Sequence, residues 1–406
     1  MSVNRCKTLL EQKNNFTMSL NRIFNYFQKQ QSEFDELLKE LVSIQTYSGN
    51  AQSINRFMDD IEKLCTPFNP EIERQKTQAG DILTLTFFPD RKKHIIFLAH
   101  ADTVKVSDNP IPLRIEHGKL FGNGSFDMKN GICLFYFTLK ALQELNIEIN
   151  RKIQIILTPD EETGSSESMP FLLKRCKGAE AVLLPEPCCP DGGVKVQRKG
   201  VAQIRAELTG KAAHSGIEPE RGIDANRALT DLISRIDQLL KTYPQVHFNP
   251  GIISGGTSIN IVSPYSYLEG ELRSYSNNSM EKAIQELERL DRIKGVQVKI
   301  SCRINHPAME FNEKIRRLYQ IAKQGAEQIG YDLPYCFTGG ASDGCSLSAA
   351  GIPVLDGLGM KGGGAHSENE FVELSDFPFR AAILANLCLV KDFGEKTKEQ
   401  RAKDKR

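Results

Sequence analysis

Apolar residues recur along the chain in two patterns, one with the period of a helix and one typical of buried strands. Helical spacing runs from Leu20 to Leu41 and again from Ser53 to Leu64. Short apolar runs follow at 82–88, 94–99, 153–158 and 181–185, with helical patterns at 129–145 and 167–176 between some of them. Buried strands that alternate with helices predict an α/β domain with a mainly parallel sheet.

The pattern changes near Gln197. We predict an alternating strand there, a helix from Asp224 to Leu240, two strands within 259–276, a helix from Ser279 to Leu290 and a strand at 296–304. This β-α-β-β-α-β order is typical of a small antiparallel sheet with two helices on one face. We therefore expect an extension at 1–20, a main α/β domain built from 21–196 and 309–406, and an inserted α+β domain at 197–308.

Composition narrows the class of protein. The 406 residues are 40% hydrophobic and 25% charged, as in a soluble globular protein, and the net charge of +1 gives no argument for a nucleic-acid or membrane partner. The longest apolar runs fall short of the roughly 18 residues of a membrane span, and the first residues lack the apolar core of a secretory signal. We expect a cytoplasmic protein. Its ten cysteines are scattered without a C-x-x-C pair, which favours reduced, packed thiols over a structural zinc site.

Polar residues that suit a metal site follow the predicted strands. His100 and Asp102 come directly after the run at 94–99, and residues two apart on a strand face the same way. A carboxylate on one imidazole nitrogen fixes the tautomer and makes the other nitrogen a better ligand. A capped strand end with a hydrogen-bonded histidine is the simpler alternative.

Further candidate ligands have simpler explanations when each is taken alone. Asp127 follows a glycine-rich turn and would equally cap the next helix. The adjacent Glu161 and Glu162 would lie in a solvated turn, and Glu186 would be a carboxylate at the rim of the sheet. His366 follows three glycines and has no apolar neighbour that would make it a core histidine. Together these residues favour one shared metal site, where one acid of the Glu pair binds metal and the other handles a proton.

The motifs HxD, GxGxxDxKxG, PDEExGS, EP, GKAAHSG, GGTxxN, GGASDG and GGGAHxxxE occur in this order between His94 and about Leu389. In this respect the chain resembles the zinc-dependent peptidases and amidohydrolases that include aminoacylases, succinyl-diaminopimelate desuccinylase and glutamate carboxypeptidases. The segment from GGASDG onward is most similar to the glutamate carboxypeptidase branch.

The resemblance implies a centre of two zinc ions, for which cobalt or manganese is an alternative. Asp127 would bridge the ions, His100 and Glu186 would bind one, and Glu162 and His366 the other. Asp102 would orient His100. Glu161 would be the general base that takes a proton from the attacking water and passes it to the leaving amine.

The resemblance also gives the inserted domain a purpose, because in relatives it closes over the site and forms a homodimer. His214 would reach the partner subunit's site and stabilise the tetrahedral oxyanion. Asn260 would contact substrate and Arg273 would hold a substrate carboxylate, which suits its planar fork. Alternatively, these three are an exposed loop histidine, a turn asparagine and a surface arginine.

Two positions depart from the family pattern. Ala99 replaces the usual glycine before His100, and His306 stands where an arginine is expected in the carboxypeptidase branch. The second departure puts a strict preference for C-terminal glutamate in doubt. We expect an enzyme that cleaves the amide bond of a small peptide or N-acyl amino acid with a free carboxylate. The alternatives are a deacylase of the desuccinylase or aminoacylase kind and, more remotely, a catalytically silent dimeric binding protein.

Overall fold

The computed structural model describes residues 20–108, 111–290, 292–293, 295–390 and 393, so the expected extension lies almost wholly outside the described residues. The chain divides into two compact units. The first comprises residues up to Val196, Phe311–Phe337 and the chain from Ala350 onward, and the second comprises Gln197–Glu310 and Thr338–Ala349. The fold class expected from the sequence, an α/β domain interrupted by an α+β domain, is confirmed.

A six-stranded mixed sheet forms the centre of the first unit, in the order β1-β2-β6-β3-β7-β15. Strands β6, β3, β7 and β15 are parallel, whereas β1 and β2 are antiparallel at one edge. The four predicted apolar runs are β2, β3, β6 and β7. The strands span Glu71–Lys76 (β1), Asp81–Phe87 (β2), His94–His100 (β3), Lys152–Thr158 (β6), Ala181–Leu183 (β7) and Val354–Leu355 (β15).

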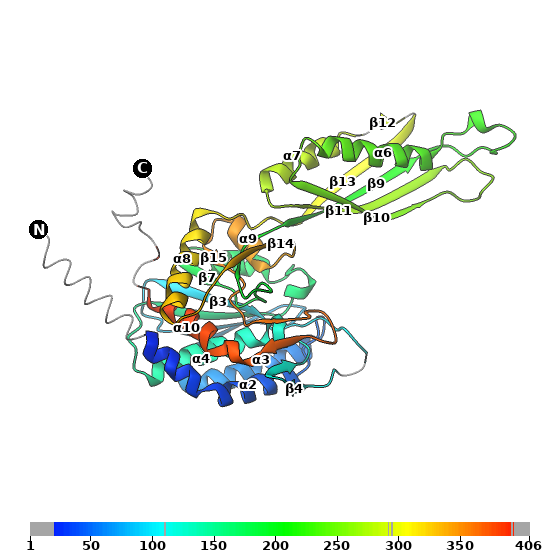
Figure 1. Ribbon diagram of the computed structural model, residues 1–406. Coiled ribbons are helices and arrows are strands. Elements are labelled where there is room, and N and C mark those ends of the chain that lie inside the picture. Colours follow the sequence, from blue (N-terminus) through cyan, green and yellow to red (C-terminus); the bar gives the residue numbers. More distant parts are fainter. Residues whose placement is uncertain (1–19, 109–110, 291, 294, 391–392, 394–406) are drawn as a thin grey trace, which may run out of the picture. The chain divides into compact units, whose positions relative to one another are not determined.

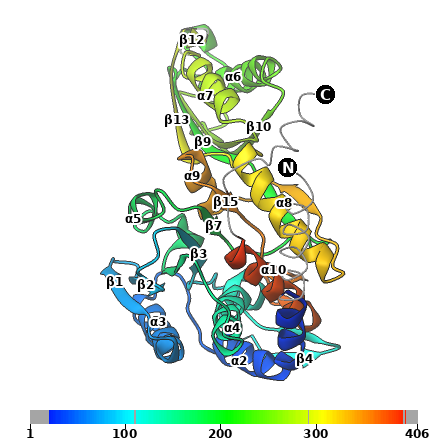
Figure 2. The same ribbon diagram turned by 90° about the vertical axis from the view of Figure 1, so that its left-hand side faces the viewer.

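Helices cover this sheet, and Figure 2 shows α3 and α4 together on one side of it. The Phe34 ring of α2 stacks on Phe377 of α10 at 3.9 Å between centroids, and Phe137 of α4 lies 5.3 Å from Phe377. These rings join three helices far apart in the sequence. Besides the helical residues 20–29, the unit contains α2 (Gln31–Ser43), α3 (Ala51–Cys65), α4 (Asn130–Glu144), α5 (Met169–Arg175), α8 (Glu313–Gln328) and α10 (Phe377–Leu389).

A small antiparallel sheet joins the end of the chain to its first third. Its order is β16-β17-β5-β4, and Phe371 of β17 is opposite Phe121 of β5. This pairing brings the glycine-rich segment after residue 361 beside the one that follows β5. The strands span Arg114–Glu116 (β4), Lys119–Phe121 (β5), Gly362–Gly363 (β16) and Phe371–Glu373 (β17).

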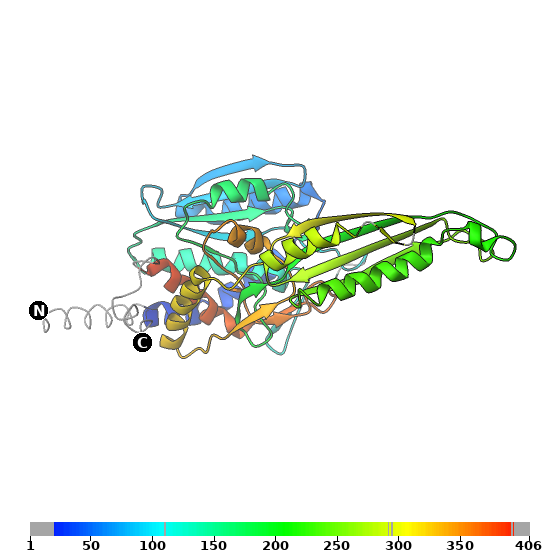
Figure 3. The ribbon, with the colours of Figure 1, turned by 90° about the horizontal axis from the view of Figure 1, so that it is seen from above.

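The second unit is an antiparallel sheet in the order β10-β11-β9-β13-β12, with α6 and α7 on one face (Figures 1 and 3). In β9 buried and more exposed residues alternate, and its buried side chains pack against the helices. Asp224 caps α6 by accepting two backbone N–H bonds. The elements are β9 (Gly200–Thr209), α6 (Ala225–Leu240), β10 (Val246–Gly255), β11 (Tyr265–Ser274), α7 (Asn277–Leu287), β12 (Arg292–Ile293) and β13 (Val296–His306).

Strand β10 differs from the expectation, which placed two strands within 259–276. Only β11 lies there, and its partner is the earlier segment 246–255, which contains Pro250. Proline cannot donate to a ladder, so it is confined to edges and bulges of a sheet. Here Pro250 lies at an edge, where the register shifts between Asn249 and Ile252. The strand was therefore not predicted because an edge strand tolerates a proline that normally argues against a strand.

Residues 338–349, which we expected in the main domain, group with the second unit. The Arg198 guanidinium donates to the carbonyls of Gly340 and Ala341 at 3.1 Å, and Arg273 donates to the carbonyl of Gly339. The segment includes the short helix α9 (Asp343–Ala349). Before it, β14 (Tyr335–Thr338) pairs with β8 (Val194–Arg198), and each of these strands crosses a boundary between the units.

The expectation of reduced thiols is wrong for one pair, because Cys189 and Cys336 form a disulfide. The two cysteines are 147 residues apart in the sequence, so their spacing could not predict the bond. In the fold their Cα atoms are 6.4 Å apart. The other cysteines in the described residues are free, and all except Cys302 are buried.

Among the residues that the structure describes, no helix combines the length and apolar character needed to cross a membrane.

Candidate metal centre

The carboxyl ends of three neighbouring strands gather the first ligand candidates. Strand β3 lies between β6 and β7 and is parallel to both, so all three end at the same edge. His100 is the last residue of β3, Glu161 and Glu162 follow β6 after a short turn, and Glu186 follows β7. Open α/β sheets bind their ligands at this edge. The polar residues placed there by the sequence therefore meet in space.

The predicted ligands form two groups that share Asp127. His100, Asp127 and Glu186 make one group, and Asp127, Glu162 and His366 make the other, with donor atoms inside each group within 4.8 Å of one another. The two oxygens of Asp127 face different groups: Oδ1 lies 3.2 Å from His100 Nε2, and Oδ2 lies 3.5 Å from His366 Nε2. A carboxylate in this position can bridge two cations.

The donor set fits a metal ion. Imidazole and carboxylate donors suit zinc and related divalent ions. Glu162 Oε1 is buried and has no hydrogen-bond partner among the described residues, although its other oxygen lies 3.0 Å from His366 Nε2. A buried carboxylate oxygen that lacks a donor is costly unless a cation approaches it.

The loop that carries Asp127 is shaped by its backbone. Gly124 has a φ of +76°, and a Cβ at this position would lie 2.7 Å from Thr103 Cγ2. Asp127 itself has φ −118° and ψ 91° and does not cap α4, whose first turn has no side-chain cap. The helix-cap alternative is therefore wrong. Within α4, a Cβ at Gly131 would lie 2.5 Å from Pro185 Cγ, so the helix can approach the segment that carries Glu186 only because residue 131 is glycine.

The charges of the two groups act on one another. Burial raises the pKa of Asp127, but hydrogen bonds from His100 and His366 outweigh this effect and hold the pKa well below its usual range. Burial lowers the pKa of His100, yet its bonds to Asp102 and Asp127 and the charges of Glu161 and Glu186 raise it well above its ordinary value. The acids thus create an environment that strongly favours positive charge.

His366 occupies an unusual backbone position. Its φ is +59°, in the left-handed region that residues other than glycine seldom adopt, and its side chain remains 51% exposed. Contacts with Asp127 and then Glu162 raise its pKa to about 10. Such backbone conformations are concentrated at functional sites, where surrounding contacts maintain them.

Asp102 lies beside His100, but its carboxylate has several partners. His100 Nδ1 is 2.8 Å from the backbone carbonyl of Asp102 and 3.5 Å from its carboxylate Oδ1. The carboxylate accepts the backbone N–H groups of Glu161 and Glu162 and the hydroxyl of Ser48. Asp102 is thus placed to orient the histidine through its carbonyl and to hold the Glu pair through its side chain.

Asp160, the first acid of the DEE sequence, shapes the turn. Its Oδ2 accepts the N–H groups of Glu167 and Ser168, and its carbonyl accepts that of Ser165 at 2.8 Å. Glu161 begins a short 3-10 turn (Glu161–Thr163), and its Oε2 lies 4.0 Å from His100 Nε2. Glu161 is absent from both ligand groups although it borders them.

Glu370 is the last residue of the motif GGGAHxxxE, and no role was assigned to it from the sequence. It is 2% exposed, and its carboxylate accepts the N–H groups of Gly124, Phe126 and Asp127, each at 2.8 Å. Burial raises its pKa to about 7 against the lowering effect of these bonds. The motif thus marked the residue, but its hydrogen bonds to the Asp127 loop could be seen only in the fold.

The predicted substrate residues lie in the second unit. His214 is exposed, its Nδ1 accepts the N–H of Gly216, and its segment is bonded to that of Asn260 through the Ser215 N–H. Asn260 is also exposed. Arg273, on β11, donates hydrogen bonds from its guanidinium group to the carboxylate of Glu271. The structure thus places His214 and Asn260 in neighbouring loops and Arg273 on the sheet.

His306, the residue that replaces an expected arginine, ends β13 opposite Val201. Burial and the charge of Arg273 lower its pKa, so His306 and Arg273 experience each other's electric field. A neutral imidazole here adds no second positive charge for a substrate carboxylate.

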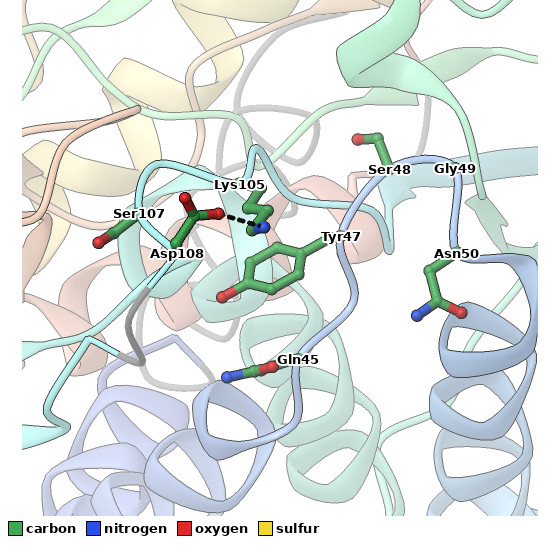
Figure 4. A pocket seen from close by; sticks show the side chains of 8 residues that line it. All are labelled: Gln45, Tyr47, Ser48, Gly49, Asn50, Lys105, Ser107 and Asp108. Carbon is green, nitrogen blue, oxygen red and sulfur yellow. Dashed lines mark hydrogen bonds and ion pairs between the residues drawn. The ribbon is translucent and has the colours of Figure 1, made fainter.

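A pocket of about 530 Å³ opens in the first unit, and Figure 4 shows the residues that line it. Its walls come from the segment before α3 and from residues 105–108, where Lys105 and Asp108 form an ion pair at 2.7 Å. Ser48 lines the pocket and donates its hydroxyl proton to Asp102 at 2.8 Å. The pocket wall is therefore one hydrogen bond away from the residue that holds the Glu pair.

Comparison with known proteins assigns the chain to a family. The model for "Peptidase family M20/M25/M40" matches residues 96–389. The chain belongs to this peptidase family. It is accordingly a metal-dependent hydrolase, and the resemblance drawn from its motifs is confirmed.

Curated relatives differ in their activities. The chain is 28% identical over 383 residues to carboxypeptidase G2 of Pseudomonas sp. (strain RS-16), covering 91% of this chain and 92% of that one. It is 25% identical over 319 residues to succinyl-diaminopimelate desuccinylase of Psychrobacter sp. (strain PRwf-1), covering 71% and 77%. Both a carboxypeptidase and a deacylase are thus among the relatives of this chain.

Solved structures share the fold. Aminopeptidase PepT of Bacillus cereus has a TM-score of 0.76 at 24% identity, covering 88% of this chain and 97% of that one. The Bacillus subtilis YXEP protein, described as a dinuclear metal-binding peptidase, has a TM-score of 0.67 at 15% identity, with 89% and 98% covered.

Metal binding to the two groups can be measured directly. We expect the metal-free protein to take up two zinc equivalents per chain, and His366→Ala to remove one of them because only the second group contains this residue. Asp127→Ala should weaken both, because its oxygens serve both groups. Titration against a chromophoric chelator, with elemental analysis, gives the stoichiometry. Exposed His247→Ala is the matched control. Two full equivalents in the His366 variant would contradict the grouping.

Proposed function

We propose that this enzyme hydrolyses the amide bond of a small peptide or N-acyl amino acid with a free carboxylate, most like a glutamate carboxypeptidase, at a centre of two zinc ions. The placement of Asp127, with one oxygen toward His100 and the other toward His366, is the observation that carries the proposal. His100 and Glu186 would hold one ion, and Glu162 and His366 the other. Cobalt or manganese would fit the same donors.

When bound, the ions supply positive charge that lowers the pKa of water and polarises a carbonyl group. The side chains do the rest. Glu161 borders the ligands without belonging to either group, so it can accept a proton from the attacking water and donate it to the nitrogen of the leaving amine. Asp102 supports this transfer, because its carboxylate fixes the backbone of Glu161 at 3.1 Å.

The second unit would supply substrate contacts and a dimer interface. β10 is an edge strand whose residues are largely exposed, and Ile252 and Ile253 are each 56% exposed. An unpaired strand edge with apolar side chains is a template for pairing with a second copy of the chain. In such a homodimer His214 would stabilise the oxyanion in the partner subunit's site, and Asn260 and Arg273 would bind substrate. The cytoplasmic location stays a prediction.

Two activities are consistent with this proposal, a carboxypeptidase and a deacylase, and they differ in the leaving group. Arg273 favours an amino acid with a free carboxylate, while its pairing with Glu271 and the neutral histidine at 306 weaken the case for a second anionic group. The alternative is a deacylase of the desuccinylase or aminoacylase kind, and a deacylase is among the relatives. A catalytically silent binding protein is disfavoured because all residues of both ligand groups, and the candidate base Glu161, are present.

A substrate panel tests the proposal. Zinc-loaded protein is assayed for amino-acid release from N-acyl-glutamates, glutamate-terminated dipeptides, N-acetyl-methionine, N-succinyl-diaminopimelate and a neutral tripeptide, each with and without chelator. Chelator-sensitive release confined to glutamate substrates supports the carboxypeptidase version. Release that favours the other acyl amino acids supports the deacylase, and no release from any substrate contradicts both.

Glu161→Gln should lower kcat by at least about 10²- to 10⁴-fold on the active substrate, because the amide cannot accept the proton of water. The variant should keep both metal equivalents, since Glu161 is outside the ligand groups. Steady-state kinetics and elemental analysis measure the two effects. Exposed Glu148→Gln is the matched control. An active Glu161 variant would show that another group is the base.

Mixing variants tests the role of His214 across the dimer. His214→Ala and Glu161→Gln should each be nearly inactive alone. A hybrid dimer joins an intact Glu161 to an intact partner histidine in one of its two sites, so a random mixture should recover roughly a quarter of the wild-type activity. Differently tagged subunits verify that hybrids form. Verified hybrids without recovered activity would place His214 outside the partner's site.

A further inference from the structure

We propose that Glu370 is a positioning residue for the metal ligand Asp127, and that it holds the loop at 122–127 in the shape that binds metal. This inference rests on the metal centre proposed above. Glu370 itself is not a ligand in either group. Its carboxylate instead lies under the backbone of the loop and accepts three N–H groups from it, those of Gly124, Phe126 and Asp127.

The bonds are divided between the two carboxylate oxygens. Oε1 accepts the N–H groups of Phe126 and Asp127, and Oε2 accepts that of Gly124. An ionised carboxylate is a pure acceptor with two oxygens, so it matches three converging donors without an unfavourable contact. The last donor is the peptide N–H of the ligand itself, which fixes the backbone from which the Asp127 side chain projects.

The sheet topology explains how Glu370 arrives at this place. β17 pairs with β5 with Phe371 opposite Phe121. One residue beyond that pair, the N–H of Gly122 donates to the carbonyl of Glu370 at 3.1 Å. The ladder thus continues into the loop and places the Glu370 side chain beneath the turn that follows. Backbone and side chain of one residue hold both the start and the end of the Asp127 loop.

Glu370 also connects the two ligand segments. It follows His366 by four residues, and His366 and Asp127 are ligands of the same group. Fixing the Asp127 loop on Glu370 therefore fixes Asp127 Oδ2 relative to His366 Nε2, which are 3.5 Å apart. Because Asp127 belongs to both groups, a displaced loop should weaken both metal positions.

A buried lysine, Lys129, lies within electrostatic reach of Glu370. Lys129 is 1% exposed, and its ammonium group donates to the carbonyl of Ile44 and lies 5.2 Å from the Phe57 ring. Burial lowers the pKa of Lys129 to about 7, against the raising effect of the Glu370 charge. The direct partners of the buried Glu370 carboxylate are thus the three backbone N–H groups, which offset part of the cost of burying it.

Glu370→Gln and Glu370→Ala test the inference on the whole chain. Glutamine keeps the shape but turns one acceptor oxygen into an N–H₂ group, which would face a backbone N–H. Alanine leaves three buried donors without an acceptor. Residues that hold metal ligands typically contribute about 10- to 100-fold to metal affinity. We expect a loss in this range for Glu370→Ala and a smaller one for Glu370→Gln. Glu368→Gln, an exposed glutamate in the same segment, is the matched control.

The measurements are zinc affinity by competition with a chromophoric chelator and the visible absorption spectrum of the cobalt-loaded protein, neither of which needs a substrate. Thermal unfolding of the metal-free proteins monitors folding. Weaker zinc binding with an altered cobalt spectrum in folded Glu370→Gln supports the proposal. If the alanine variant does not fold, the glutamine variant alone provides the test. Wild-type affinity and spectrum in Glu370→Gln would overturn it, whatever its effect on unfolding.

Failure of the underlying metal centre would look different. In that case the wild-type chain itself would bind zinc weakly or with less than two equivalents, and the comparison between variants would have no reference. A wild-type protein that binds two equivalents while the Glu370 variants bind equally well overturns only the positioning role.

Discussion

The crowding of buried carboxylates is the constraint on which the site depends. Besides the acids that face a metal position, Asp102, Asp160 and Glu370 are almost wholly buried, and each accepts at least two backbone N–H groups. Charged acceptors make strong hydrogen bonds to the backbone. These three acids therefore offset part of their burial cost by fixing the loops that carry the ligands. The candidate ligands are thus supported by a second set of buried carboxylates that are not in the ligand groups.

Much of the main sheet could be predicted from the sequence, because strands buried on both faces are continuous apolar runs, as in β3 and β6. Strands β1 and β10 were missed because they lie at edges, are mostly exposed and carry no such run. The disulfide between Cys189 and Cys336 was missed for another reason. Its partners meet only through the tertiary fold, which sequence spacing does not encode.

The candidate site shows the same division. His100, Asp127, Glu162, Glu186 and His366 could be named because each stands in a motif whose residue types suit a metal. Their supports could not. The role of Glu370 depends on the register of β17 on β5, and the bond from His100 Nδ1 to a backbone carbonyl depends on the exact course of the chain. Ligand chemistry is local in sequence, whereas the geometry that makes it work is not.

The order of the ligands along the chain has a consequence for biosynthesis. His100, Asp127 and Glu186 leave the ribosome before the second unit begins, whereas His366 and Glu370 follow it. Chains fold from the N-terminus as they are made. A nascent chain would therefore offer only the first proposed group, His100, Asp127 and Glu186, until the segment that carries His366 emerges. If the proposed ligands are right, the inserted unit separates the synthesis of the two ligand groups, and the second group is complete only after His366 has been made.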